Sequence, residues 1–116
     1  MHNRSVVEQT FEVMARMNLK VEHDFTFEAE GKHLCLWLAS VYDRYTRYRK
    51  DYAIAGEVLT ASQFRKQLEH SEYFIAKNKP KRMGDAIRKV WTVDFEKLSQ
   101  TADVSGFLTV SLDADD

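Results

Sequence analysis

The amino-acid sequence predicts a single α+β domain, and three observations lead to that prediction. Residues 20–27 alternate apolar and polar side chains, which is typical of a half-buried strand, whereas residues 32–52 carry apolar side chains at the three- and four-residue spacing of an amphipathic helix. A short helix over residues 61–70 then precedes two further strands, at 73–77 and 87–95. A chain of 116 residues can build one hydrophobic core without disulfides.

The first helix is expected over residues 5–17. Ser5 and Glu8 form a capping box, in which each side chain satisfies a free backbone amide of the first turn. One apolar face of the helix holds Val7, Phe11 and Met14. We expect this face to be buried in the core or docked on another domain.

The longest predicted element is the helix over residues 32–52. Its inward positions are Leu34, Trp37, Leu38, Val41, Tyr45 and Tyr48. The outer face interleaves arginines with tyrosines, which fits stacking on nucleic-acid bases. A half-buried tyrosine seam, with basic residues near the helix C-terminus, is the preferred interpretation. Residues 51–58, with Gly56, are expected to form a connection.

The short helix that follows has a second capping box, Thr60 with Gln63. Phe64 and Leu68 are four residues apart and are expected to face inward. The outward side chains include Gln63, Arg65 and Lys66, the candidates for contact with a nucleic-acid groove because they are long hydrogen-bond donors. The same set also fits an ordinary solvated helix.

The two last strands are joined by residues 78–85, expected as an eight-residue loop marked by Pro80 and Gly84. The candidate phosphate contacts on this hairpin are Lys77, Lys79, Lys81, Arg82 and Arg88. An inward row is expected from Ile87, Trp91, Val93 and Phe95. A lysine-rich edge hairpin that resists aggregation is the alternative. DNA contact is preferred because a basic helix directly precedes a basic hairpin.

That order, a capped helix and then a basic hairpin, is typical of a winged helix-turn-helix. The predicted fold is therefore an α+β winged helix-turn-helix with an extra N-terminal helix and strand. Its core is expected over residues 32–100, with 1–31 as an N-terminal extension and 101–116 as an acidic tail. At the end of this core, Asp94 or Thr92 is expected to cap a short helix. In the tail, residues 107–112 are expected to form a weak terminal strand and 113–116 a frayed end.

Composition restricts the class of protein. The chain is 44% hydrophobic and 30% charged, which is typical of a globular protein. No apolar run reaches the roughly 18 residues of a membrane span, and a single cysteine excludes an internal disulfide, so we expect a cytoplasmic protein without membrane contact. The formal net charge of -1 conceals a basic centre and an acidic C-terminal part.

Catalytic and metal-binding signatures are missing from the sequence. It contains no GxxxxGK[ST] loop, no GxGxxG turn and no GxSxG elbow, so we expect no enzyme and no cofactor. His23, His33, Cys35 and Asp24 are the best metal candidates, but they lack the tight ligand pairs of structural zinc. His33 and Cys35 would also point to different faces of the predicted helix. We expect Cys35 to be a small buried apolar side chain.

The stretch VYDRYTRYRKDYAIAGEVLTASQFRKQL, residues 41–68, carries a family resemblance. It combines a tyrosine-bearing helix, a Gly56-Glu57 loop, and Leu59-Thr60 followed by Phe64 and Leu68. Together with the basic hairpin, it resembles the winged-helix modules at the C-terminus of replicative AAA+ helicases and primase-helicases of phages, plasmids and other mobile elements. The resemblance covers about half of the chain and does not include the helicase motor.

The resemblance implies non-catalytic binding of duplex, forked or single-stranded DNA in the replication or maintenance of a mobile element. It also implies a helicase or primase as parent or partner. The alternative is a protein-interaction or oligomerisation module that uses the Val7, Phe11 and Met14 face and the acidic tail. RNA binding is disfavoured because no RNP-like pair of aromatic strands is present.

Overall fold

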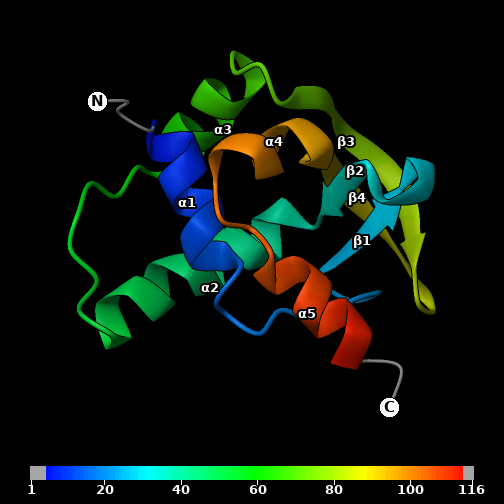
Figure 1. Cartoon of the computed structure of the whole chain (residues 1–116), viewed down its shortest axis with the longest axis horizontal. Helices are drawn as coiled ribbons and strands as arrows, with labels where there is room; N and C mark the ends of the chain where they lie inside the picture. The colour runs from blue at the N-terminus through cyan, green and yellow to red at the C-terminus, as the bar shows by residue number, and fades with distance from the viewer. Residues whose placement is uncertain (1–4, 114–116) are drawn as a thin grey trace.

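The computed structural model describes residues 5–113, which form five α-helices and one four-stranded antiparallel sheet. The predicted α+β class is therefore confirmed. The strand order is β1-β2-β4-β3, so that β1 (Phe25–Glu28) and β3 (Phe74–Met83) are the edges and β2 (His33–Leu36) and β4 (Ala86–Asp94) are central. The α-helices gather on one side of this sheet (Figure 1).

Helix α1 (Val6–Met14) begins at the predicted cap. Ser5 Oγ accepts the N–H of Glu8 at 3.3 Å, and Glu8 Oε1 accepts the N–H of Ser5 at 2.9 Å. The helix ends at Met14 rather than Met17, and Asn18 then adopts a left-handed φ of 58°. The face formed by Val7, Phe11 and Met14 is buried in the main core. Of the two predicted roles for this face, core packing is thus the observed one.

The strand predicted from residue 20 is correct only in its second half. Residues 22–24 form a turn, and β1 begins at Phe25. The Asp24 N–H donates to the carbonyl of Lys20 at 2.8 Å, while the Asp24 carboxylate accepts the N–H of Lys20 at 2.7 Å. These two bonds close the chain into a turn, and His23 is left exposed.

The prediction of one helix over residues 32–52 was wrong at its start. Residues 33–36 form β2, which pairs Leu34 with Phe27 of β1 and with Val93 of β4. Leu34, Cys35 and Leu36 are all buried, and a short continuous apolar run does not distinguish a strand from a helix by its period. Helix α2 (Leu38–Asp51) follows directly, and the 3-10 turn η1 (Ala29–Gly31) connects β1 to β2. The connection expected after α2 is confirmed.

The eight-residue loop predicted between the last two strands does not form. Strand β3 continues to Met83 and β4 starts at Ala86, which leaves a two-residue turn, Gly84-Asp85. Pro80 pairs with Lys89 inside β3, and proline is tolerated there because β3 is an edge strand. Two register shifts, between Phe74 and Ala76 and between Ala76 and Lys79, mark irregularities in β3.

Helix α3 (Ala61–Glu69) matches its prediction. Thr60 and Gln63 form both hydrogen bonds of the capping box, and Phe64 and Leu68 are fully buried. In the predicted inward row, Trp91, Val93 and Phe95 are buried, but Ile87 is 62% exposed because it lies near the hairpin turn, beyond the core.

The C-terminal part contains two helices. Asp94 caps α4 (Phe95–Thr101) by accepting the N–H of Lys97 at 2.9 Å, as predicted for one of its two candidate caps. The predicted terminal strand is instead helix α5 (Gly106–Asp113), whose Phe107 packs edge-on against Phe25 with ring centroids 5.1 Å apart. Of the predicted frayed end, residues 114–116 lie outside the described part of the chain.

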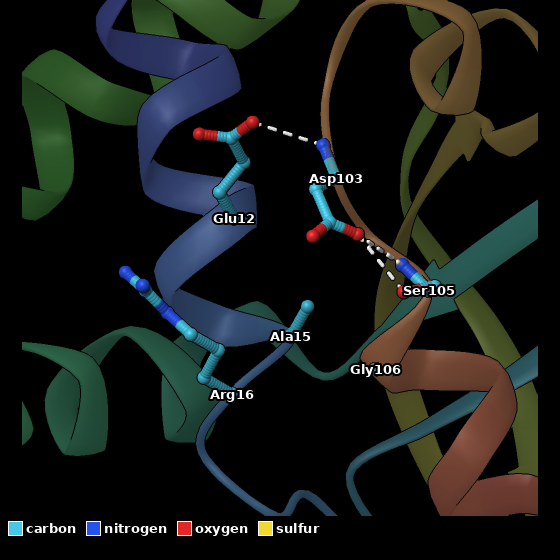
Figure 2. A pocket seen from close by; sticks show the side chains of 6 residues that line it. All are labelled: Glu12, Ala15, Arg16, Asp103, Ser105 and Gly106. Atoms are coloured by element: carbon cyan, nitrogen blue, oxygen red, sulfur yellow. Dashed lines mark hydrogen bonds between the residues drawn. The ribbon is translucent and has the colours of Figure 1, made fainter.

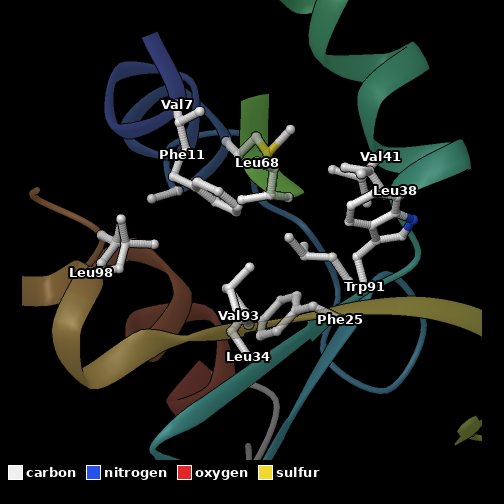
Figure 3. Close-up of a cluster of buried hydrophobic side chains, with 14 of the residues drawn as sticks. Val7, Phe11, Phe25, Leu34, Leu38, Val41, Leu68, Trp91, Val93 and Leu98 are labelled. Carbon is white, nitrogen blue, oxygen red and sulfur yellow. The ribbon is translucent and has the colours of Figure 1, made fainter. Parts of the chain in front are cut away.

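The main core lies between the helices and one face of the sheet. Figure 3 shows side chains from α1, α2, α3 and α4 converging on those of the strands. A second, smaller cluster on the other face of the sheet contains Cys35, Met83 and Val90, with Trp37 packed against it. Within residues 5–113, none of the helices has both the length and the apolar character needed to cross a bilayer.

Candidate nucleic-acid interface

The sheet has two faces, and the register of its strands assigns each candidate residue of the hairpin to one of them. Trp91 and Val93 point into the main core, so Val90 and Thr92 point to the opposite face, which we call the outer sheet face. Residues directly paired across two strands share a face. Lys79 pairs with Val90, and Lys81 pairs with Arg88.

Lys79, Lys81 and Arg88 therefore lie on the outer sheet face. Arg82 pairs with Ile87 and lies on the other face. The cations that the sequence placed together on one loop are thus divided between two sides of a regular hairpin.

Two of the predicted lysines form ion pairs within the chain. The Lys77 Nζ lies 2.8 Å from Glu69 Oε2 of α3, and the Lys81 Nζ lies 2.5 Å from Glu28 Oε2 of β1. The hydrogen bond between Lys81 and Glu28 raises the pKa of the lysine and lowers the pKa of the carboxyl. Both ammonium charges are balanced by a neighbouring carboxylate, which weakens their attraction for a phosphate.

Arg88 is engaged with an aromatic ring. Its guanidinium carbon lies 3.8 Å from the centroid of the Trp37 ring, within the range of a cation–π interaction. Arg88 is half-buried. This side chain therefore joins β4 to the residue that precedes α2.

The three candidates on α3 differ in how much of each side chain is available. Gln63 Oε1 accepts the N–H of Thr60 at 3.0 Å, so the amide nitrogen of Gln63 is the atom left for a ligand. Arg65 is half-buried and lines a shallow cavity of about 310 Å³ with Tyr42. Lys66 is exposed.

Three predicted cations are exposed and form no ion pair within residues 5–113: Lys66, Lys79 and Arg82. In Figure 1, α3 stands near the start of β3 and the hairpin turn stands at the far end. The ten residues of β3 span roughly 30 Å at ~3.3 Å per residue. That span is close to one turn of B-form DNA, about 34 Å.

The hairpin turn rests against the loop of residues 20–24. Gly84 has a left-handed φ of 64°, and a Cβ at this position would lie 3.1 Å from the carbonyl oxygen of Glu22. Only a residue without a side chain makes this approach without strain. The turn is therefore braced by the N-terminal part of the chain.

The loop of residues 20–24 is itself held by a buried carboxylate. Asp24 Oδ1 lies 2.5 Å from a guanidinium nitrogen of Arg44 in α2 and 2.8 Å from His23 Nδ1. Burial alone would raise the pKa of Asp24, but the hydrogen bonds from the Lys20 N–H and His23 and the charge of Arg44 outweigh burial and lower it. The ionised carboxylate thus fixes the loop that supports the hairpin turn.

Sequence reasoning missed the residues that position the hairpin, namely Asp24, Glu28, Trp37 and Gly84. Gly84 had a usable signal, because a glycine in a two-residue Gly-X connection is typical of a tight hairpin turn. Asp24, Glu28 and Trp37 act through partners far away in the sequence, and no local pattern marks them.

A separate cavity of about 370 Å³ lies between α1 and α5 (Figure 2). Glu12 Oε2 accepts the N–H of Asp103 at 2.9 Å, and Asp103 Oδ1 accepts the hydroxyl of Ser105 at 2.9 Å. A Cβ on Gly106 would lie only 1.9 Å from the carbonyl oxygen of Ala15, so the helices touch there. The Glu12 carboxylate thus joins α1 to the loop that precedes α5.

The metal candidates also lie differently from expectation. His33 and Cys35 occupy alternate positions of β2 and thus share the outer sheet face, contrary to the helical prediction. Burial raises the pKa of Cys35 to about 11, and its Sγ lies 3.5 Å from Thr92 Oγ1. Cys35 is fully buried, as predicted. No three His, Cys, Asp or Glu side chains of residues 5–113 are grouped so that they could hold a metal ion.

Comparisons of the chain with family models, curated proteins and solved structures found no match. A functional proposal therefore rests on the fold and on the exposed cations described above.

Proposed function

We propose that the chain is a winged helix-turn-helix domain that binds DNA without catalysing a reaction, in the replication or maintenance of a mobile element. The main observation in support of this proposal is that α3, which is capped at its N-terminus and exposed on one side, leads directly into a long antiparallel hairpin. Lys66, Lys79 and Arg82 extend from these elements without an ion pair in residues 5–113. Exposed cations of this kind bind phosphates by displacing condensed counterions.

The order of elements supports the winged-helix assignment. Helix α1, strand β2, helices α2 and α3, and the hairpin β3-β4 follow one another, and β2, β4 and β3 are neighbours in the sheet. In this proposal, α3 is the recognition helix and the β3-β4 hairpin is the wing. Strand β1 is an addition at the sheet edge.

The candidate contacts divide into two groups in this proposal. Lys66, Lys79 and Arg82 bind phosphates, and Gln63 and Arg65 provide further donors from α3. Lys77, Lys81 and Arg88 hold the hairpin in place through Glu69, Glu28 and Trp37. A helicase or primase is the partner or parent we propose, and the free thiol of Cys35 fits the reducing cytoplasm.

The alternative, a protein-interaction module, has lost its first support because the Val7, Phe11 and Met14 face is buried. The acidic tail remains as its second support, and the structure adds the connection between α2 and α3, where Tyr52 is 69% exposed and Val58 is 49% exposed. Dimerisation that is measured by light scattering without DNA and is abolished by Tyr52→Ser would favour this alternative.

Fluorescence anisotropy with labelled duplex, forked and single-stranded DNA at ~50 mM salt tests the proposal. We expect binding whose affinity falls with salt at a log-log slope of about -0.9 per phosphate contact, or roughly -3 for three contacts. A triple variant, Lys66→Ala, Lys79→Ala and Arg82→Ala, should reduce affinity for all sequences and flatten the slope.

The matched control is the triple variant Lys32→Ala, Lys50→Ala and Lys97→Ala. It removes the same charge from exposed lysines outside α3 and the hairpin. We expect it to keep most of the affinity and the slope. Equal losses in both triple variants, or no binding by the wild-type chain to any of the three DNA forms, would contradict the proposal.

A further inference from the structure

The outer sheet face contains a cavity of about 310 Å³ beside edge strand β3. Its polar lining consists of Glu28, His33, Lys79, Lys81 and Thr92. Val90, Pro80 and Ile75 supply an apolar wall. We propose that this cavity binds a single unpaired nucleotide, with the phosphate at Lys79, Lys81 and His33 and the base against the apolar wall.

The charges of the cavity favour an anion. Lys81 is balanced by Glu28, whereas Lys79 has no ion pair within residues 5–113. The charge of Lys79 is therefore uncompensated, and His33 stands on β2 opposite Glu28. A phosphate placed here would gain the Lys79 charge, and Lys81 would be shared between the phosphate and Glu28.

The shape of β3 creates the cavity. Ala76 and Lys79 are three positions apart, whereas their partners Thr92 and Val90 are two positions apart, so β3 carries one extra residue here. Asn78, inside this bulge, has a left-handed φ of 55°. Bulges re-aim side chains and are frequent beside functional sites. Ala76 and Lys79, the residues that flank this bulge, both line the cavity.

An added peptide strand is a poorer occupant than a nucleotide. Pro80 has no N–H, and the bulge interrupts the ladder of the edge strand, so an incoming strand would find a broken row of partners. The volume is at the small end of ligand sites, which suits a compact ligand. A nucleotide combines the two features that the cavity recognises, an anionic group and a flat apolar surface.

The inference deepens the proposed function, because a fork or a strand end would supply the unpaired nucleotide. A free nucleotide has the same chemistry, so the experiment separates the two sources. We propose amide NMR titrations of the full chain with thymidine 5′-monophosphate, with inorganic phosphate and with a short oligothymidylate. The nucleotide should shift the amides of residues 33, 76–79 and 90–92 in a saturable manner.

Inorganic phosphate should bind at least about ten-fold more weakly than the nucleotide, because it lacks a base to pack on the apolar wall. Shifts of the same amides by the oligothymidylate would assign the cavity to single-stranded DNA. Shifts by the mononucleotide alone would assign it to a free nucleotide. Equal affinities for phosphate and nucleotide, or no saturable shift by the nucleotide, would overturn the proposal.

A pair of matched variants tests the location. Ile75 is 40% exposed on the cavity wall, and Ile87 is 62% exposed on the same hairpin but outside the cavity. Ile75→Glu places a carboxylate beside the phosphate and should weaken nucleotide binding at least about ten-fold, whereas Ile87→Glu should not. Lys79→Gln is the second cavity variant and should also weaken binding. Unchanged affinity in both cavity variants would overturn the assignment.

Duplex binding, measured by anisotropy with the same samples, keeps the two proposals apart. Ile87 pairs with Arg82 and Ile75 lines the cavity with Lys79, so a glutamate at either position would also repel a duplex phosphate. Duplex affinity is therefore compared in the neutral variants Ile75→Gln and Ile87→Gln, which should retain most of it. Saturable shifts by the nucleotide, without binding of duplex, forked or single-stranded DNA, would leave the cavity assigned and the proposed function refuted. Binding of duplex DNA without saturable shifts by the nucleotide would support the proposed function and refute the cavity assignment.

Discussion

Arg88 of β4 lies over the ring of Trp37, with its guanidinium carbon 3.8 Å from the ring centroid. The backbone N–H of Trp37 donates to the carbonyl of Asp24 at 3.0 Å, and the Trp37 ring stands edge-on to His23 with centroids 6.2 Å apart. The hairpin, the start of α2 and the loop of residues 20–24 are thus linked by consecutive contacts. A hairpin held in this way is pre-organised, so it loses less freedom when it binds a ligand.

Removing the guanidinium should loosen this link. We expect Arg88→Ala to lower the free energy of unfolding by about 0.5–2 kcal/mol, the range of a cation–π interaction that is partly shielded from water. Urea denaturation measures this change. The neighbouring Lys89 is exposed, so Lys89→Ala should change stability by less than about 0.5 kcal/mol. Equal effects of the two substitutions would show that the Arg88–Trp37 contact contributes nothing.

The hairpin turn should be sensitive to a single methyl group. Gly84→Ala forces an L-residue into a φ of 64° and brings its Cβ to 3.1 Å from the Glu22 carbonyl oxygen. We expect a loss of about 1–2 kcal/mol in the free energy of unfolding. Gly84→Asn should lose less, because asparagine tolerates this region better than alanine. Asp85→Ala, at the exposed neighbouring position, is the control, and a similar loss there would contradict the explanation.

The elements that the sequence predicted well are specified by neighbours in the chain. The capping boxes of Ser5 with Glu8 and Thr60 with Gln63 each join residues three positions apart, and both helices start where predicted. The capping bonds depend on no distant contact. Because these hydrogen bonds are local, the sequence alone predicted where α1 and α3 begin.

The elements that were missed depend on distant partners. Residues 33–36 become a strand because β1 and β4 pair with them on both sides, and β4 lies more than fifty residues away. In the hairpin, Pro80 looked like a loop residue, but an edge strand accepts it. Periodicity within one segment carries no information about such pairing.

The sequence predicted which cations belong to the candidate interface. It did not predict which of them are exposed and which are held by a partner within the chain. Lys79 and Lys81 are both lysines of one hairpin, and nothing in their local sequence distinguishes them. Glu28, far away in the chain, balances Lys81 and leaves Lys79 unpaired within the described residues. Tertiary structure thus separated the exposed cations from those that hold the hairpin.

The turn between β1 and β2 stores backbone strain that glycine should relieve. Ala29 and Glu30 have left-handed φ values of 54° and 56°. We expect Ala29→Gly to raise the free energy of unfolding by about 0.5–1 kcal/mol, because the folded-state strain exceeds the entropy that glycine adds to the unfolded chain. Ala39→Gly in α2 is the control and should have the opposite sign, a loss of about 0.5–1 kcal/mol. Thermal or urea unfolding measures both.

The buried carboxylate of Asp24 should make the stability of the chain depend on pH. Its pKa is lowered in the folded chain, so the unfolded chain binds a proton more readily than the folded one. The stabilisation is therefore fully present above the unfolded pKa of about 4 and is lost as the pH falls through the lower, folded pKa. We expect the wild-type chain to lose stability steeply below about pH 4.

Asp24→Asn should remove most of that dependence and leave Arg44 without its counter-ion. Arg44 is 37% exposed, so water screens part of its charge, and the variant should be less stable at pH 7 by about 1–3 kcal/mol, a difference that should shrink towards pH 2. The exposed pair of Asp43 and Arg47 supplies the control, since Asp43→Asn should cost less than about 0.5 kcal/mol. Urea denaturation at pH 7, 5, 4, 3 and 2 measures these differences. A constant difference between wild type and Asp24→Asn across this series would mean that the Asp24 charge does not hold the loop, and packing of the side chain would be the better explanation.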